Sequence, residues 1–425
     1  MLNRVEAPEL NQIDGIVLVR PEEIIFKNGL KVFVFRSDEQ ELIKAEFVFN
    51  NLFEKNENPI RNTALSTLLK EGTNKRSSAD IAETIDYYGA YLIPEFSFDQ
   101  NALTFYTLKK HVNAILPVVH DVLTDSIIPQ KELDTYIRNN KQNLQITLEK
   151  NDVLARRMFY NNLFGANRYG ISTTSDLLSQ LNREDLIELY NKQIQPQNAT
   201  LFLSGNITPD VLDAFRNYFE NQWDAKDLHI NSPFIAQPQF TNELTVLERE
   251  NALQSSIRLG KASIQRNHSD YPYLQFVNTL LGGYFGSRLM SNIREEKGYT
   301  YSINSMVANL NHAGFITLIT DVGAEHTKDT LKQIELEINK LQQEKTSDTE
   351  IELVRNYLLG GMLGSLESIF SHTDKFKSVY FSGLDLDYYK YYSDVVKNIN
   401  AEHILDIAQK YLGYEDMLKI VVGKG

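Results

Sequence analysis

The stretch LNREDLIELYNKQIQPQNATLFLSG, residues 181–205, returns near the end of the chain as INAEHILDIAQKYLGYEDMLKIVVG, residues 399–423. The two segments align without a gap at a constant offset of 218 residues. Identical residues occupy the pairs Asn182/Asn400, Glu184/Glu402, Lys192/Lys410 and Gly205/Gly423. Each copy predicts a capped helix, a short loop and a strand. Because each copy closes one half of the chain, the pattern indicates an internal duplication.

The remaining segments follow the same plan in both halves. Strands are predicted at 29–35, 43–50 and 101–108 in the first half and at 313–320 in the second, with amphipathic helices between them. We therefore expect the α+β class, with two tandem homologous domains, each an antiparallel sheet with helices packed on one face. The predicted boundaries are an N-terminal domain at 1–222, a linker at 223–245 and a C-terminal domain at 246–425.

Composition and charge exclude several functional classes. The chain has 425 residues, no Cys and a formal net charge of −13. Without Cys there is no disulfide framework, thiolate zinc site or cysteine nucleophile. Because so acidic a surface repels the phosphate backbone of nucleic acids, we expect no nucleic-acid partner. No apolar run reaches the length of a membrane span. The N-terminus lacks a signal-peptide pattern, which predicts a cytoplasmic protein, although a chain trimmed of its signal would read the same way.

Few side chains are spaced for chemistry. No two of the eight His residues lie within five positions of each other, so no helix carries the His pair that metal sites use. We interpret His111, His120 and His372 as ordinary surface residues. The glycine cluster at 281–289 lacks the spacing of a dinucleotide fingerprint, and we interpret it as a flexible loop between two helices.

The segment GSRLMSNIREEKGYTYSINS, residues 286–305, is more informative. Arg294 is predicted in a helix, and Tyr301 begins a strand beyond a turn at Gly298. An Arg and a Tyr at this spacing are most often a surface pair. The helix–Gly–strand context also lets both point past one sheet edge, where they would hold a peptide carbonyl or its oxyanion.

In combination, GGYFGSRLMSNIREEKGYTYSI, FKNGLKVFVF and KEGTNKRSSADIAETIDYYGAYL resemble the pitrilysin/insulinase/mitochondrial processing peptidase family. The resemblance covers nearly the whole chain, from about residue 24 to its end. It implies the fold called LuxS/MPP-like metallohydrolase and assigns the family's Arg and Tyr to Arg294 and Tyr301.

Catalytic members of this family bind zinc through an inverted H-x-x-E-H motif and a distal Glu. By the family's spacing to Gly72, the motif belongs at 63–67, which reads Thr-Ala-Leu-Ser-Thr. Thr63, Ser66 and Thr67 thus replace ligands and base. The distal Glu belongs near 137–148, a stretch without a carboxylate. The resemblance therefore implies no metal or other cofactor in this chain.

The resemblance implies a non-catalytic subunit of a heterodimeric zinc metallopeptidase. Arg294 and Tyr301 would act in trans on the zinc site of a homologous partner, with peptides or unfolded segments as substrates. Alone, the chain would be inactive. Two alternatives remain: a non-enzymatic peptide-binding or structural assembly subunit of the same fold, and an active metallopeptidase with a non-standard metal site.

Overall fold

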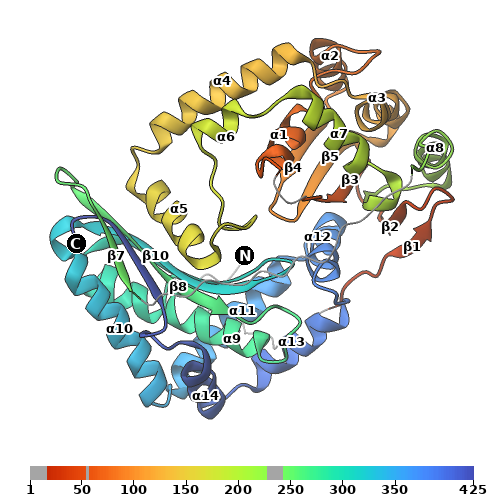
Figure 1. The fold of residues 1–425 in the computed structure, drawn as a ribbon. Coiled ribbons are helices and arrows are strands. Elements are labelled where there is room, and N and C mark those ends of the chain that lie inside the picture. Colours follow the sequence, from red (N-terminus) through yellow and green to blue (C-terminus); the bar gives the residue numbers. More distant parts are fainter. Residues whose placement is uncertain (1–16, 54–56, 227–242) are drawn as a thin grey trace, which may run out of the picture.

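Two sheets organise the chain, one in each half, in a computed structural model that describes residues 17–53, 57–226 and 243–425 (Figure 1). The first sheet has the order β1-β2-β6-β3-β5-β4, with bounds Glu22–Ile25, Lys31–Arg36, Ala199–Gly205, Leu42–Asn50, Gln100–Leu108 and Tyr91–Phe96. The second has the order β7-β11-β8-β10-β9, with bounds Leu244–Glu248, Leu418–Gly423, Gln254–Ser263, Gly314–Gly323 and Thr300–Asn309.

Helices connect the strands in both halves. In the first half they are α1 (Arg61–Leu68), α2 (Ser78–Tyr87), α3 (Val112–Asp125), α4 (Gln130–Thr147), α5 (Asn151–Phe164), α6 (Ser175–Ser179), α7 (Arg183–Gln193) and α8 (Pro209–Phe219). In the second they are α9 (Tyr271–Asn278), α10 (Thr327–Gln343), α11 (Asp348–Gly364), α12 (Ile369–Tyr380), α13 (Asp387–Asn398) and α14 (Ala401–Tyr411). Two π-helical segments, η3 (Thr279–Gly283) and η4 (Met290–Glu296), follow α9.

The predicted α+β fold with two similar halves is confirmed. The repeated segments become α7–β6 and α14–β11, and Asn182 and Asn400 cap their helices by accepting backbone N–H bonds. The sheets differ from the prediction in one pairing each, since β6 runs parallel to β2 and β11 parallel to β7, whereas all other described pairings are antiparallel. The parallel pairs arise because each half returns its last strand to the sheet centre through a long helical crossover.

One helix of each half packs on the sheet of the other half. Helix α5 packs on β8 and β11 of the second sheet, and α12 packs on β2 and β6 of the first (Figure 1). Both helices begin at the repeat offset, since Asn151 and Ile369 are 218 positions apart. Each sheet therefore has the helices of its own half on one face, as predicted. Its other face is covered by a helix from the other half, α12 on the first sheet and α5 on the second.

The exchanged helices bury aromatic side chains between the halves. Phe159 of α5 is fully buried and packs against Phe315 of β10, with ring centres 6.1 Å apart. A Cβ at Gly260 of β8 would lie 2.1 Å from the Ile316 carbonyl oxygen and 2.8 Å from Cζ of Phe159, so glycine is needed where β10 and α5 both approach β8. Around α12, Phe376 lies 4.7 Å from Phe33. A fully buried Phe contributes about 1.5–3 kcal/mol, so the exchange joins the halves firmly.

The structure describes only the two ends of the predicted linker, 223–226 and 243–245. Trp223 is buried in the first core, and β7 already begins at Leu244. The predicted linker residues 227–242 lie outside the described part of the chain. Within the described part, no helix combines the length and the apolar character needed to cross a membrane.

Candidate functional site

Helix α1 carries positions 63–67, where the resemblance predicts the metal motif of catalytic relatives. Ser66 is buried and donates its hydroxyl to the Glu95 carbonyl at 3.0 Å. Thr67 is exposed and donates to the Thr63 carbonyl one turn earlier, at 3.2 Å. The hydroxyl groups of Ser66 and Thr67 therefore donate to backbone carbonyls. Neither an imidazole nor a carboxylate projects from this turn of α1.

Helix α4 contacts α1 and contains nearly all of the stretch predicted for the distal Glu. That stretch has Arg138 and Lys141 but no acidic side chain, and Lys141 donates to Ser179 at 2.6 Å. In the three described segments, no group of three His, Asp or Glu side chains is arranged to hold a metal ion. Since zinc sites use imidazole, thiolate or carboxylate ligands, the residues present at α1 and α4 do not fit zinc.

Arg294 and Tyr301 meet on the second half. The Arg294 guanidinium carbon lies 5.2 Å from the centre of the Tyr301 ring and 4.6 Å from that of Phe285. The cation is thus held by two aromatic rings, an arrangement worth about 0.5–1 kcal/mol per contact at exposed positions. The rings themselves face solvent, with Tyr301 87% and Phe285 61% exposed. We call Phe285, Arg294 and Tyr301 the cation–aromatic cluster.

Local backbone geometry brings the cluster together. Gly298 has φ +67°, and no atom lies within 4 Å of the place where a Cβ would sit, so its glycine is required by the backbone turn alone. Phe285 follows η3 and Arg294 lies within η4, and π-helical segments are frequent at functional sites. Sequence reasoning missed Phe285 because it interpreted the glycine cluster around it as a loop without a role.

Neighbouring polar residues anchor the cluster to its own half. Arg288 donates two hydrogen bonds to Glu350 of α11, at 2.7 and 2.8 Å. Tyr299 donates to Asp329 at 2.9 Å and stacks on His326 at 4.1 Å between ring centres. The hydrogen bond to Asp329 raises the pKa of the Tyr299 phenol. Arg288 and Tyr299 are therefore structural, although they lie beside Arg294 and Tyr301 in sequence.

The structure does not bring α1 and the cluster together. Helix α1 packs in the core of the first sheet, with β4, β5, α4 and α7. The segment η4 packs on β9 and α10 in the core of the second sheet. Within one chain, Arg294 and Tyr301 therefore belong to a different packing unit from Thr63, Ser66 and Thr67.

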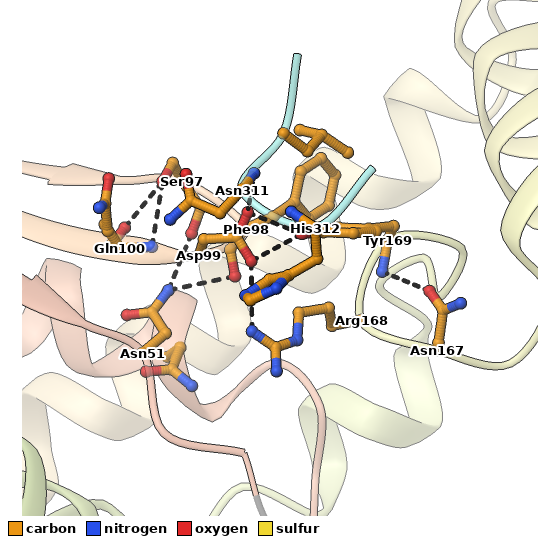
Figure 2. Close-up of polar contacts among 12 residues, drawn as sticks. Asn51, Ser97, Phe98, Asp99, Gln100, Asn167, Arg168, Tyr169, Asn311 and His312 are labelled. Atoms are coloured by element: carbon orange, nitrogen blue, oxygen red, sulfur yellow. Dashed lines mark hydrogen bonds and ion pairs between the residues drawn. The ribbon is translucent and has the colours of Figure 1, made fainter. Parts of the chain in front are cut away.

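A buried polar junction fixes the two halves against each other (Figure 2). Asp99, from the turn between β4 and β5, accepts hydrogen bonds from the Tyr169 hydroxyl at 2.8 Å and from the Asn311 backbone N–H at 3.1 Å. Arg168 also donates to Asp99, at 3.2 Å. The Tyr169 hydroxyl in turn accepts from the backbone N–H of His312 at 3.2 Å. Burial lowers the pKa of His312, despite the opposing effect of Asp99.

A buried ion network crosses the same boundary beside α12. Lys44 and Glu46 of β3 point away from the first core and towards α12. There Lys44 donates to Asp374 at 2.7 Å, and Lys377 donates to Glu46 at 2.6 Å. Lys44 and Glu46 are themselves buried. Removing one member would leave a buried charge uncompensated, so the network holds α12 in one register on the sheet.

One prediction about a histidine is wrong. His120, expected at the surface, is buried, with its Nε2 3.1 Å from the Gln222 carbonyl and its ring against Tyr218 and Phe219. The helix α3 that carries it is covered by α8, which comes nearly 90 residues later in the sequence. Burial lowers the pKa of this imidazole.

Comparison with known proteins agrees with this picture. Residues 180–358 match a family model described as the peptidase M16 inactive domain. The uncharacterized zinc protease YmxG of Bacillus subtilis is 23% identical over 345 residues, which cover 80% of this chain and 82% of that protein. The probable inactive metalloprotease YmfF of the same organism is 19% identical over 237 residues, covering 55% of this chain and 54% of that protein.

Solved structures share the fold. The crystal structure of a peptidase M16 inactive domain from Pseudomonas fluorescens superposes with a TM-score of 0.86 at 18% sequence identity, over 96% of this chain and 98% of that one. Together with the family model and the curated relatives, this likeness confirms the predicted resemblance to the pitrilysin/insulinase/mitochondrial processing peptidase family.

Proposed function

We propose that this chain, a relative of the M16 peptidases that carries their inactive domain, is a non-catalytic subunit of a heterodimeric zinc metallopeptidase. The observation that carries the proposal is the contrast between its two candidate sites. At the metal-motif positions of helix α1, Ser66 and Thr67 have hydroxyl groups that donate to backbone carbonyls, whereas the cation–aromatic cluster is preformed and faces solvent. A chain that retains the second site without the first requires a partner to complete it.

In this proposal the partner is a homologous chain with an intact zinc motif, and its zinc and carboxylate activate the water. The present chain contributes groups that bind and orient the substrate. The Tyr301 phenol donates to the carbonyl oxygen of the scissile peptide bond, where negative charge develops. The Arg294 guanidinium binds the same or the adjacent carbonyl, and its position between two rings limits the rotamer freedom lost on binding.

The proposed substrates are peptides or unfolded segments. Strand β9, which begins beside Tyr301, is the edge of the second sheet, and Met306 on it is exposed. An extended peptide would pair with such an edge through backbone hydrogen bonds and reach the cluster at its end. The contact with the partner subunit is expected to bury on the order of 1,600 Å² or more, as in stable complexes.

Reconstitution tests the proposal. The full chain is mixed with a zinc-bearing M16 homologue from the same organism, complex formation is measured by light scattering, and cleavage of a quenched fluorescent peptide is followed. We expect a 1:1 complex that cleaves peptide, and no cleavage by this chain alone. Failure to form any complex would overturn the proposal. A complex whose turnover is the same with or without an intact cation–aromatic cluster would favour the structural assembly subunit instead.

A further inference from the structure

A pocket of about 610 Å³ opens between α9, α11, α12 and α13, and its lining contains no residue of the cation–aromatic cluster. About half of its lining residues are aromatic or aliphatic, among them Tyr357, Tyr392 and Leu358, and the others are polar or charged, including the carboxylate of Asp374. Two basic side chains, Arg266 and Lys375, also line it. This volume is typical of sites for small organic ligands, which combine an apolar wall with a few polar groups.

The two basic groups lack acidic partners among the described residues. Among the described residues, no carboxylate lies within salt-bridge distance of Arg266 or Lys375, and Asp374, which also lines the pocket, is paired with Lys44 and Lys377 instead. Arg266 donates to the Ser378 carbonyl, and the Lys375 ammonium lies 5.9 Å from the centre of the Tyr389 ring. Burial, and then the charge of Arg266, lower the pKa of Lys375. In a protein with net charge −13, the pocket therefore holds two cations without acidic partners, and its one lining carboxylate, Asp374, is already paired with Lys44 and Lys377.

Two further lining residues, Tyr388 and Gly361, bear on what the pocket could bind. The hydroxyl oxygen of Tyr388 is buried at the pocket wall and has no hydrogen-bond partner in the described structure. Gly361 lies inside α11 and lines the pocket, yet no atom lies within 4 Å of the place where its Cβ would sit. A helix-interior glycine lowers stability relative to alanine, and packing within this chain gives no reason for it. Gly361 is exposed, so a side chain added at this lining position would meet open space.

We propose that this pocket binds a small organic carboxylate with an aromatic or aliphatic body. Arg266 and Lys375 would neutralise the carboxylate, the Tyr388 hydroxyl would donate to it, and the body would lie against Tyr357, Tyr392 and Leu358. A free acid and the C-terminal residue of a peptide share this chemistry. The proposal does not depend on the role of Arg294 and Tyr301.

Calorimetric titration of the full chain tests the site. The probes are 3-phenylpropionate, its neutral amide, N-acetyl-L-phenylalanine and inorganic phosphate. We expect the two carboxylates to bind with a dissociation constant on the order of 1 mM or tighter, and the amide and phosphate at least tenfold more weakly. Tighter binding of N-acetyl-L-phenylalanine assigns a peptide C-terminus, and tighter binding of 3-phenylpropionate assigns a free acid. Equal binding of acid and amide, or no binding of either acid, overturns the proposal.

Three variants locate the binding. Lys375→Met removes a charge that burial disfavours, so it is expected to fold with equal or higher melting temperature and to weaken carboxylate binding at least tenfold. Gly361→Leu fills the pocket and improves the helix, so it is expected to abolish binding while also raising the melting temperature. Lys390→Gln, on the exposed surface of α13, is the matched control and keeps wild-type binding. Wild-type affinity in either of the first two variants overturns the assignment.

Discussion

The Tyr169 hydroxyl lies 2.8 Å from each carboxylate oxygen of Asp99 and joins two parts of the chain that are 70 residues apart. Asn311, from the other half, donates to the same carboxylate. A single buried acidic group thus connects the first sheet, the loop after α5 and the hairpin between β9 and β10 (Figure 2). Because the cation–aromatic cluster lies on the same half as that hairpin, this junction helps to fix the position of the cluster relative to the first half of the chain.

Tyr169→Phe is expected to lower the free energy of unfolding by about 1.5–3 kcal/mol, the range for a hydrogen bond to a charged group. The substitution removes a donor to buried Asp99 and an acceptor for the His312 backbone N–H. Urea denaturation checks the value. Tyr160→Phe is the matched control, since no hydrogen bond is described for that hydroxyl, and it should change stability little. An equal effect of both substitutions would contradict the role assigned to the junction.

The purified, folded chain is expected to bind no stoichiometric zinc, because Thr63, Ser66 and Thr67 offer no imidazole or carboxylate. Elemental analysis of protein dialysed against zinc checks this. The triple variant Thr63→His, Ser66→Glu and Thr67→His tests whether the motif residues alone create a zinc site. Without a carboxylate on 137–148, even that triple variant is expected to bind zinc more weakly than a complete site. About one zinc per wild-type chain would contradict the prediction.

Tyr301→Phe is expected to reduce turnover of the reconstituted complex about a hundredfold, because one preorganised donor to a developing oxyanion contributes roughly 3 kcal/mol. Complex formation should not change, since the ring and its contact with Arg294 are retained. Comparing kcat with the dissociation constant of the two subunits separates these effects. Wild-type turnover would assign the chain to a scaffold role.

Arg294→Ala is expected to lower turnover at least as much and to raise KM as well, because the guanidinium is assigned to substrate binding. Lys297→Ala, an exposed cation on the same turn, serves as control and should leave both constants within about twofold of wild type. Tyr299 and Arg288 should matter less for turnover. Arg288→Ala is expected instead to lower stability, because it leaves Glu350 partly buried without its partner.

Stability is expected to fall on mild acidification through His120. Burial places the pKa of the folded-state imidazole below its unfolded value of about 6.5. The unfolded chain therefore binds the proton more readily, so this contribution is complete above pH 6.5 and is lost as pH falls below it towards the folded-state pKa. Urea denaturation between pH 7.5 and 5.5 checks this. His120→Gln should show a smaller loss over the same range, and an identical loss would assign the effect to other groups.

Local signals in the sequence predicted much of the fold. The Asn caps of α7 and α14, the strands that follow them and the breaks near Gly72 and Gly298 depend on interactions within a few residues. Such interactions are encoded by residue type and spacing, so they can be recognised without a structure. The same holds for the missing metal ligands at 63–67, since absence of a side-chain type is a property of the sequence alone.

Contacts between distant segments were decided only by the tertiary structure. The amphipathic pattern of α5 and α12 indicates that one face of each helix is buried, but it does not say that each covers the sheet of the other half. The burial of His120 by α8, the meeting of Phe285 with Arg294 and the junction at Asp99 likewise join residues whose spacing carries no periodic signal. The sequence by itself therefore determined the elements, their duplication and the absence of His and carboxylate side chains at 63–67. Packing between the halves decided which faces are covered, because many partners can satisfy an apolar face and only the complete fold selects one.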